Sequence, residues 1–408
     1  MSRPPDNSVH QRRVFYIPGY DPIHPRRYRE LYRKESAAQA DISNYTIGLQ
    51  AKPGKSEHYG WHVDATIEGV ETQTQFDVLV WSDIVRTSMD GSILHSYRLL
   101  AQTAWIYISS GALFRLMRLR KGPIIAALYP VGMLLAQLAL ALCLVLAGAL
   151  LGGFGWPVYG AWIGALVGAV LGWQVLRWFR AKDGRFFAYY LMHDYAYSAA
   201  TKGKNPPELE ARMSEFADVI ARALTEGIDE VLVVGHSSGA HLAVSILSDL
   251  IRAGRVPSHG PALSFLSLGQ VVPMVSFLPE AHRLRADLHF LSQRAELAWV
   301  DVTAPGDGCA FALCDPVSVS GVAPDNKRWP LVFSAAFTQS LSPARWKELR
   351  WRFFRLHFQY LCAFDRPKDY DYFQITAGPK TLGRRYDGRA PSKSRLEKAV
   401  SKFTSMAA

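Results

Sequence analysis

The stretch Val231-Leu-Val-Val-Gly-His-Ser-Ser-Gly-Ala240 decides the fold expected for this chain. An apolar, β-branched run leads into Gly235-x-Ser237-x-Gly239, and small and apolar residues at helical spacing follow. This pattern predicts a strand, a very tight turn and a helix, with glycines where the backbones pass too closely for a Cβ atom. Such a turn directs the serine hydroxyl and the helix N-terminal amides toward a reacting carbonyl. A nucleophilic serine at Ser237 is therefore expected, and an inert glycine-rich turn is the alternative.

Strand and helix patterns alternate around this turn. The expected strands are residues 13–17, 58–69, 75–81, 230–234, 263–268 and 297–302, and the expected helices are residues 25–40, 92–120, 186–200, 208–225, 239–253 and 279–293. Helices that alternate with strands indicate a mostly parallel sheet with helices on both faces. The chain is therefore expected to belong to the α/β class.

A long apolar stretch interrupts this alternation. From Gly122 to Leu176 the sequence contains no Asp, Glu, Lys, Arg or His, a stretch of 55 residues. Its length allows two passes of a bilayer core, since each pass needs about 20 residues. We expect the passes at residues 124–151 and 158–176, joined by a short turn. A buried hairpin in a soluble protein is the alternative.

Glycines recur at every fourth position of the second pass. They are Gly160, Gly164, Gly168 and Gly172. In an apolar helix this spacing allows close approach to a neighbouring helix. The first pass is the expected neighbour, and a homodimer through the same face is the alternative.

Basic residues flank the apolar stretch on both sides. They are Arg115, Arg118, Arg120 and Lys121 before it and Arg177, Arg180, Lys182 and Arg185 after it. By the positive-inside rule both flanks belong on the cytoplasmic side. The polar residues 1–7 have no signal-peptide pattern. A multi-pass protein of a bacterial inner membrane, with both soluble parts in the cytoplasm, is therefore expected.

The net charge of +11 indicates a negatively charged binding partner. The basic residues form no recognisable nucleic-acid-binding module, so nucleic acid is not expected. A bilayer surface is the expected partner. The four cysteines have neither a disulfide pattern nor metal spacing. No metal or organic cofactor is expected.

The chain divides into four expected parts. Residues 1–121 supply the early strands, residues 122–178 the transmembrane hairpin, residues 179–379 the main α/β domain, and residues 380–408 a basic, partly ordered tail. Residues 184–206 and 316–345 are candidate lids.

A serine nucleophile needs a histidine base. The histidines after Ser237 are His241, His259, His282, His289 and His357. His241 is expected to point away from the serine. His259 is expected in a loop at the wrong edge of the sheet, and His282 and His289 are expected on one helix. His357 follows all the expected strands, as the base does in this type of fold. It is the preferred base, and a core histidine is the alternative.

The base in turn needs a carboxylate. The expected strand at residues 297–303 ends in Ala-Pro-Gly-Asp307, and a turn just past a strand end suits a catalytic acid. Asp307 is therefore preferred. Asp301, within the strand, and Asp315, in Cys-Asp-Pro, are the alternatives.

An oxyanion hole requires two amide donors near the serine. The Ser238 amide is one, directly after the nucleophile. The loop Ile17-Pro-Gly-Tyr-Asp21 follows an early strand, so we expect the Tyr20 amide as the second donor and Gly19 as the residue that permits close approach.

With these residues the chain resembles the α/β-hydrolase superfamily and, within it, the class 3 (fungal-type) lipases. The resemblance rests on Gly235-His-Ser-Ser-Gly239, Val302-Thr-Ala-Pro-Gly-Asp307 and His357-Phe-Gln-Tyr360. It covers residues 205–375 and the loop near Gly19. It implies a lipase-type or esterase activity, although a two-pass membrane insertion is not a feature of those secreted enzymes.

The expected function is hydrolysis of a lipid-like carboxylic ester by a membrane-anchored serine hydrolase. Ser237 attacks, His357 transfers the proton and Asp307 orients the histidine. An acyltransferase or thioesterase with the same triad and an inactive hydrolase-fold membrane scaffold are the alternatives. The aromatic residues of 346–364 are expected either to contact an acyl chain or to pack in the core.

Overall fold

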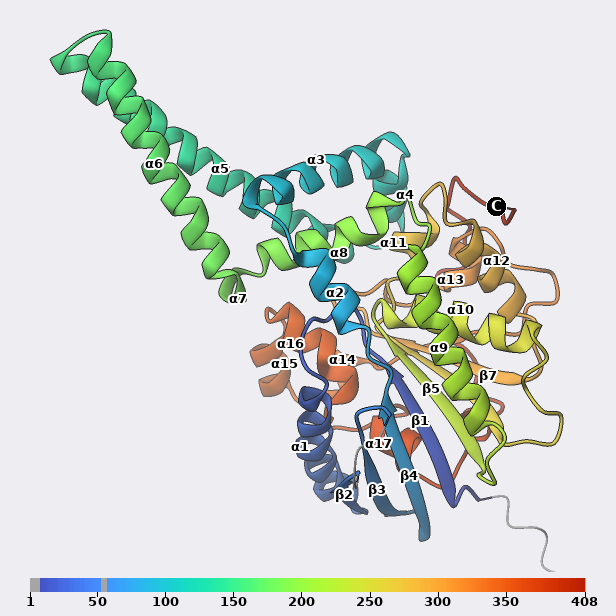
Figure 1. Ribbon diagram of the computed structural model, residues 1–408. Helices are drawn as coiled ribbons and strands as arrows, with labels where there is room; N and C mark the ends of the chain where they lie inside the picture. Colours follow the sequence, from blue (N-terminus) through green and yellow to red (C-terminus); the bar gives the residue numbers. More distant parts are fainter. Residues whose placement is uncertain (1–7, 53–56, 408) are drawn as a thin grey trace, which may run out of the picture.

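An eight-stranded sheet runs through the body of the protein, with helices on both faces (Figure 1). The computed structural model describes residues 8–52 and 57–407. The strands are β1 (Gln11–Ile17), β2 (Thr46–Ala51), β3 (Gly60–Ile67), β4 (Val70–Val78), β5 (Glu230–His236), β6 (Ala262–Leu268), β7 (Leu297–Thr303) and β8 (Leu331–Ser334). Their order is β2-β3-β4-β1-β5-β6-β7-β8. The pairs β2–β3 and β3–β4 are antiparallel and the other five strand pairs are parallel, so the expected α/β class with a mostly parallel sheet is confirmed.

Helices fill the connections between the strands. Before the apolar stretch they are α1 (Arg26–Ser43), α2 (Ser82–Met89), α3 (Ile93–Ser109) and α4 (Ala112–Leu119). The apolar stretch forms α5 (Lys121–Gly155) and α6 (Tyr159–Ala181). After it come α7 (Asp183–Phe186), α8 (Ala188–Ala200), α9 (Pro207–Ala223), α10 (Gly239–Arg252), α11 (Val272–Ser276), α12 (His282–Leu291), α13 (Pro316–Val319), α14 (Phe337–Ser340), α15 (Pro343–Leu349), α16 (Phe353–His357), the 3-10 helix η1 (Phe358–Leu361), α17 (Tyr372–Ala377) and α18 (Leu382–Arg385).

The central strands are buried on both faces, which explains their continuous apolar runs. Every residue of β5 is buried. One large apolar cluster packs α9, α10 and α12 against one face of the sheet, and a second packs α1, α16 and α17 against the other. This double cover holds the carboxyl ends of β1, β5, β6 and β7 at one edge, where the expected site residues lie.

Two strands escaped prediction. The β2 strand lies at the edge of the sheet and is exposed or half-buried throughout, so its sequence lacks an apolar pattern. The β8 strand has four residues and follows Pro330, at the opposite edge. Short edge strands carry weak patterns because few of their side chains are buried.

The C-terminal segment, residues 380–407, pairs with the body at several points, and its description as a partly ordered tail stays a prediction. Leu396 forms a bridge with Cys314, and the Ser392 amide donates to the Val332 carbonyl at 2.9 Å. Backbone pairing therefore holds this segment although it has few large apolar residues. Residues 1–7, which bear on the signal-peptide expectation, lie outside the described residues.

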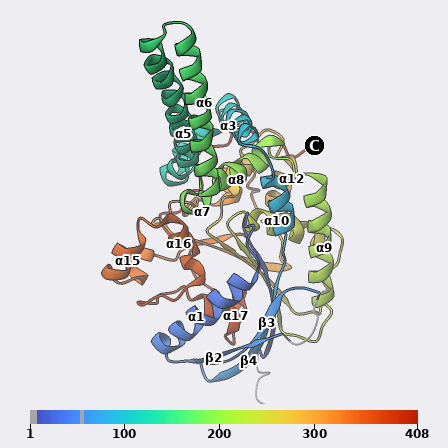
Figure 2. The same ribbon diagram turned by 60° about the vertical axis from the view of Figure 1, so that its left-hand side comes forward.

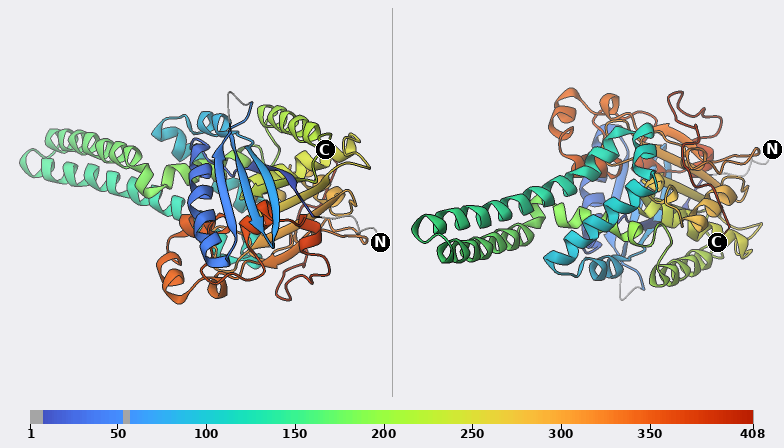
Figure 3. Two further views of the ribbon diagram at one scale, coloured as in Figure 1. Left: turned by 90° about the horizontal axis from the view of Figure 1, so that it is seen from below. Right: turned by 90° about the horizontal axis from the view of Figure 1, so that it is seen from above.

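The α5 and α6 helices form an antiparallel hairpin that projects from the body (Figures 1 and 3). Both are long and apolar enough to cross a membrane. The first turns of α5 pack on the body, where Pro123, Ile124 and Leu134 are buried. The outer part, about 20 residues in each helix, spans about 30 Å at 1.5 Å per residue, the thickness of a bilayer core.

The glycine face of α6 lies against α5 of the same chain. A Cβ atom on Gly164 would lie 1.9 Å from the Gly148 carbonyl oxygen, and one on Gly160 would lie 2.3 Å from that of Gly152. The helices therefore touch backbone to backbone, as expected for the antiparallel pair. A homodimer through this face would require these contacts to separate, and it stays a prediction.

Candidate active site

Ser237 occupies a strained turn between β5 and α10. Its φ is 55°, a left-handed value that is uncommon for a residue with a side chain. A Cβ atom on Gly235 would lie 2.7 Å from the Gly239 carbonyl oxygen, and one on Gly239 would lie 2.1 Å from the Ile17 carbonyl oxygen. The Ser237 amide donates to the Leu268 carbonyl at 2.9 Å. The two glycines thus permit a sharp turn that leaves the Ser237 side chain half-buried at the end of the sheet.

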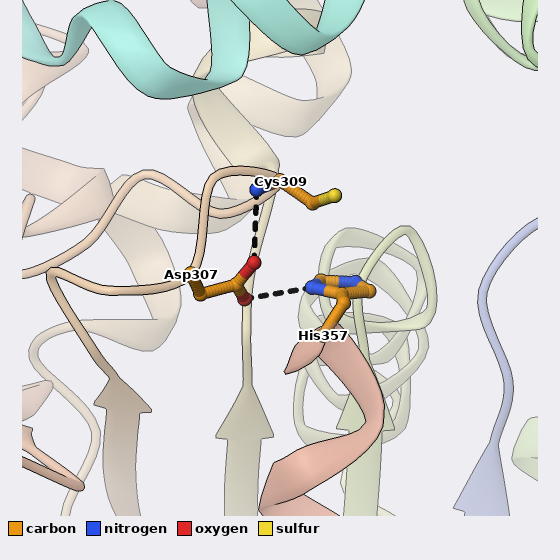
Figure 4. A group of neighbouring side chains, drawn as sticks. All are labelled: Asp307, Cys309 and His357. Atoms are coloured by element: carbon orange, nitrogen blue, oxygen red, sulfur yellow. Dashed lines mark hydrogen bonds and ion pairs between the residues drawn. The ribbon is translucent and has the colours of Figure 1, made fainter. Parts of the chain in front are cut away.

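Asp307 and His357 meet at the same end of the sheet. Asp307 follows β7, and His357 is the last residue of α16. The Asp307 Oδ2 and His357 Nδ1 atoms lie 2.7 Å apart, and both side chains are buried (Figure 4). The other ring nitrogen, Nε2, is buried and has no hydrogen-bond partner among the described residues. A histidine held by a carboxylate at Nδ1 offers Nε2 for proton transfer.

Two further groups hold the Asp307 carboxylate. The Tyr360 hydroxyl donates to Oδ2 at 3.1 Å and accepts from the Ala304 amide at 2.9 Å. The Cys309 amide donates to Oδ1 at 2.8 Å (Figure 4). Burial raises the pKa of Tyr360 well above its usual value, so its hydroxyl remains a donor at neutral pH.

His236, next to the serine, supports the backbone of His357. Its Nε2 atom lies 3.1 Å from the His357 carbonyl oxygen, and its Nδ1 lies 3.2 Å from the Tyr16 hydroxyl. The two imidazole rings stack at a centroid distance of 4.8 Å. Burial lowers the pKa of His236 well below its usual value, so this ring is neutral at pH 7. It packs against the His357 ring.

The loop after β1 lies directly against the serine. A Cβ atom on Gly19 would lie 3.0 Å from the Ser237 Cβ and 3.4 Å from its Oγ, so only glycine leaves room for a substrate there. Within the described residues the amides of Tyr20 and Ser238 donate no hydrogen bond. The Tyr20 side chain binds Ser88, with its hydroxyl 2.6 Å from the Ser88 Oγ atom. Two free amides therefore flank Ser237, as an oxyanion hole requires.

A cavity of about 760 Å³ connects these groups. Ser237, Ser238, Tyr20 and His357 all line it, and most of its remaining wall is apolar or aromatic. The α8 helix forms part of this wall, so the candidate lid at residues 184–206 borders the site. Of the other candidate lid, residues 316–345, only Arg345 reaches the cavity.

Several polar side chains of the cavity were not predicted, among them Asp194, Cys309 and His241. Asp194, on α8, has its pKa raised to about 7 by burial, and its charge couples to His357. Cys309 has its thiol pKa raised well above the usual value, also by burial. His241 lines the cavity although a position away from the serine was expected, and burial lowers its pKa to about 4. Asp194 carries no sequence signal because α8, which is distant from Ser237 in the sequence, brings it to the cavity, whereas Cys309 and His241 lie within a few residues of Asp307 and Ser237.

The alternative acids lie elsewhere. Asp301 is buried within β7, where it accepts from Ser267 Oγ at 2.6 Å, and burial raises its pKa to about 8. Asp315 caps α13 and pairs with Lys327. Asp307 is the candidate that contacts His357.

The remaining histidines also lie apart from the serine. His282 and His289 sit on α12 and contact backbone carbonyls. His259 is exposed in the loop before β6.

The acid, thiol and imidazole could in principle hold a metal ion. Ligand atoms of Asp307, Cys309 and His357 lie within 4.8 Å of one another. The carboxylate and the imidazole already bind each other, however, and burial favours the neutral thiol over the thiolate that binds metals. The group is therefore better suited to proton transfer than to metal binding.

A scan against protein-family models and searches of curated proteins and of solved structures give no match for this chain. The functional argument therefore rests on the geometry of the site.

Proposed function

We propose that this chain is a membrane-anchored serine hydrolase of the α/β-hydrolase superfamily that cleaves lipid-like carboxylic esters. One observation carries the proposal: the Asp307–His357 pair, with a free Nε2, borders the same cavity as a serine at a strained strand–helix turn. A serine, a base held by a carboxylate and two free amides form the minimal set for acyl transfer.

The chemistry follows from these positions. Ser237 Oγ attacks the ester carbonyl while His357 Nε2 takes its proton, and the amides of Ser238 and Tyr20 stabilise the oxyanion. The histidine then gives the proton to the departing alcohol, which leaves an acyl ester on Ser237. A water molecule, deprotonated by His357, attacks this ester, releases the carboxylic acid and restores the serine. Asp307 stabilises the imidazolium in both steps.

The hairpin supports a membrane location. Its outer part exposes large apolar side chains, including Leu150, Leu151 and Phe154, which water would solvate poorly. The basic residues at its base favour a cytoplasmic body attached to an inner membrane. An ester dissolved in that membrane lies within reach of the cavity.

Two other functions use the same fold. An acyltransferase or thioesterase would share every residue named above, and an alcohol or thioester substrate distinguishes them from an esterase. An inactive scaffold would keep the fold without an activated serine. The free Nε2 and the free amides favour an active enzyme over the scaffold.

Fluorophosphonate labelling of membranes tests the proposal, because this reagent captures only an activated serine. We expect labelling of the wild type and its loss in Ser237→Ala and His357→Ala. The matched controls are Ser258→Ala and His259→Ala, two exposed positions in the loop between α10 and β6. Absence of labelling in the folded wild type would contradict the hydrolase and favour the scaffold.

A further inference from the structure

The segment of residues 345–355 combines basic and aromatic side chains beside the cavity. It contains five basic residues and one acidic residue, Glu348. Trp351 is 72% exposed and Phe353 is 45% exposed. Exposed tryptophan and arginine side chains are typical of surfaces at the headgroup layer of a membrane.

This basic–aromatic segment lies next to the base of the hairpin. The Phe354 ring packs on Phe187, the residue that follows α7, at a centroid distance of 4.8 Å. Figure 2 shows α15 and α16 beside α7, on the side of the body from which α5 and α6 project. A bilayer that surrounds the hairpin would therefore bring its headgroups close to this segment.

The cavity reaches the surface at the same place. Arg345, Leu349, Phe354 and Arg355 line it, and the Arg355 side chain is 55% exposed. A lipid could thus pass from the headgroup layer to the serine without leaving the protein surface.

The charges of the segment remain largely unneutralised. Glu348 is shared by three arginines, Arg345, Arg352 and Arg355. Arg350 stacks over Trp351 at 5.7 Å and forms no ion pair among the described residues. Each basic residue near an anionic lipid surface strengthens binding to it. The surface is therefore complementary to phosphate headgroups that carry net negative charge.

We propose that residues 345–355 dock on anionic headgroups of the bilayer that holds the hairpin, and that the lipid ester cleaved at Ser237 is an anionic phospholipid. The choice of substrate rests on the proposed hydrolase function, whereas the docking does not. Arg345 and Arg355 contact the headgroup phosphate at the cavity mouth, and Trp351 and Phe353 enter the interface.

Hydrogen exchange of the full chain in lipid nanodiscs tests the docking. One set contains phosphatidylcholine alone, and the other contains phosphatidylcholine mixed with phosphatidylglycerol. We expect amides of residues 350–353 to exchange about tenfold more slowly in the anionic discs, because docking suppresses local opening. Arg350→Glu/Arg352→Glu should abolish this difference. Lys393→Glu/Lys398→Glu, the same charge change on the exposed C-terminal segment, should retain it.

Release of fatty acid from the two lipids, in discs that contain both, tests the substrate. We expect faster cleavage of phosphatidylglycerol, with the preference lost in Arg350→Glu/Arg352→Glu. Equal exchange in both discs overturns the docking, even where Ser237 is labelled by fluorophosphonate. Slower exchange in anionic discs without serine labelling supports the docking and overturns the hydrolase. Docking with equal cleavage of both lipids overturns the choice of substrate alone.

Discussion

The hairpin and the serine turn both depend on glycines that let two backbones touch, yet they differ in how far the partners lie apart in the sequence. In the hairpin, Gly164 meets Gly148, a neighbour in the same apolar stretch. At the turn, Gly239 meets Ile17, which is more than two hundred residues away. A local contact can be recognised from the spacing of residues, whereas a distant one depends on the whole sheet. The two regions should therefore respond differently to substitution.

The largest effect is expected in the site that depends on distant contacts. Asp307→Asn removes the carboxylate that stabilises the His357 imidazolium, and by analogy with serine proteases kcat should fall about 10⁴-fold. Ester hydrolysis measures the loss. Asp301→Asn is the matched control, because this acid is separate from His357, and the raised pKa of its carboxyl keeps it neutral at pH 7. An equal loss in both variants would contradict the assigned acid.

Gly239→Ala should unfold or strongly destabilise the body. The added Cβ would lie 2.1 Å from the Ile17 carbonyl oxygen, so β1 and α10 must separate. We expect a loss of about 3 kcal/mol in the free energy of unfolding. Chemical denaturation in detergent measures it. In Gly227→Ala the new Cβ meets no atom within 4 Å, and stability should stay near that of the wild type.

Gly164→Ala should affect the hairpin and spare the body. Its Cβ would lie 1.9 Å from the Gly148 carbonyl oxygen, and we expect a cost of about 2 kcal/mol to the helix pair. Gel mobility in sodium dodecyl sulfate reports the pairing, and fluorophosphonate labelling reports the site. Gly132→Ala, with open space at its Cβ, is the control. If two copies of the chain crosslink in the membrane and Gly164→Ala abolishes this crosslink, the homodimer is favoured instead.

Tyr360→Phe tests the support of the acid. Loss of the hydroxyl removes one hydrogen bond to Asp307 and leaves the Ala304 amide without an acceptor, so kcat should fall about tenfold. The pH profile should also shift, because Tyr360 acts by positioning the carboxylate. Tyr386→Phe removes a hydroxyl that donates to the Asp369 carbonyl, away from the site, and should leave the profile unchanged.

The smallest effect concerns Asp194. Burial raises its pKa from 3.8 to about 7, so the folded state binds more protons than the unfolded state between these values. The contribution of Asp194 to the free energy of unfolding therefore falls as the pH rises from about 4 to 7. Above pH 7 this contribution stays unfavourable. We expect Asp194→Asn to be more stable than the wild type at pH 8. The gain should be only about 1 kcal/mol, because the Asp194 side chain is half-buried at an open cavity where solvent screens its charge.

Thermal unfolding at pH 4 and pH 8 measures the difference. The gain from Asp194→Asn should disappear at pH 4, where the wild-type carboxyl is protonated in the folded state. Asp325→Asn, at an exposed position, should behave like the wild type at both values. A gain of equal size at both pH values would show that packing, not charge, is responsible.

Much of the fold was accessible from the sequence because its central strands are buried on both faces. The runs that form β5, β6 and β7 are mostly apolar, and helical patterns separate them in the sequence. The edge strands β2 and β8 were missed, because exposed backbone pairing leaves no apolar pattern.

The sequence by itself predicted the serine turn and the two apolar helices, since the Gly235-x-Ser237-x-Gly239 spacing and the apolar stretch are local patterns. The contact of Gly239 with Ile17 that supports the turn came only from the sheet. It proposed Asp307 and His357 from their positions after the strands but left Asp301 and Asp315 open. Only the tertiary structure shows that Asp307 is the one of these acids that contacts His357, because the Nδ1–Oδ2 contact joins residues 50 positions apart. The tertiary structure also brought Asp194 into the cavity and the basic–aromatic segment beside the hairpin. Such placements depend on how the sheet and its helices pack, and no local pattern encodes them.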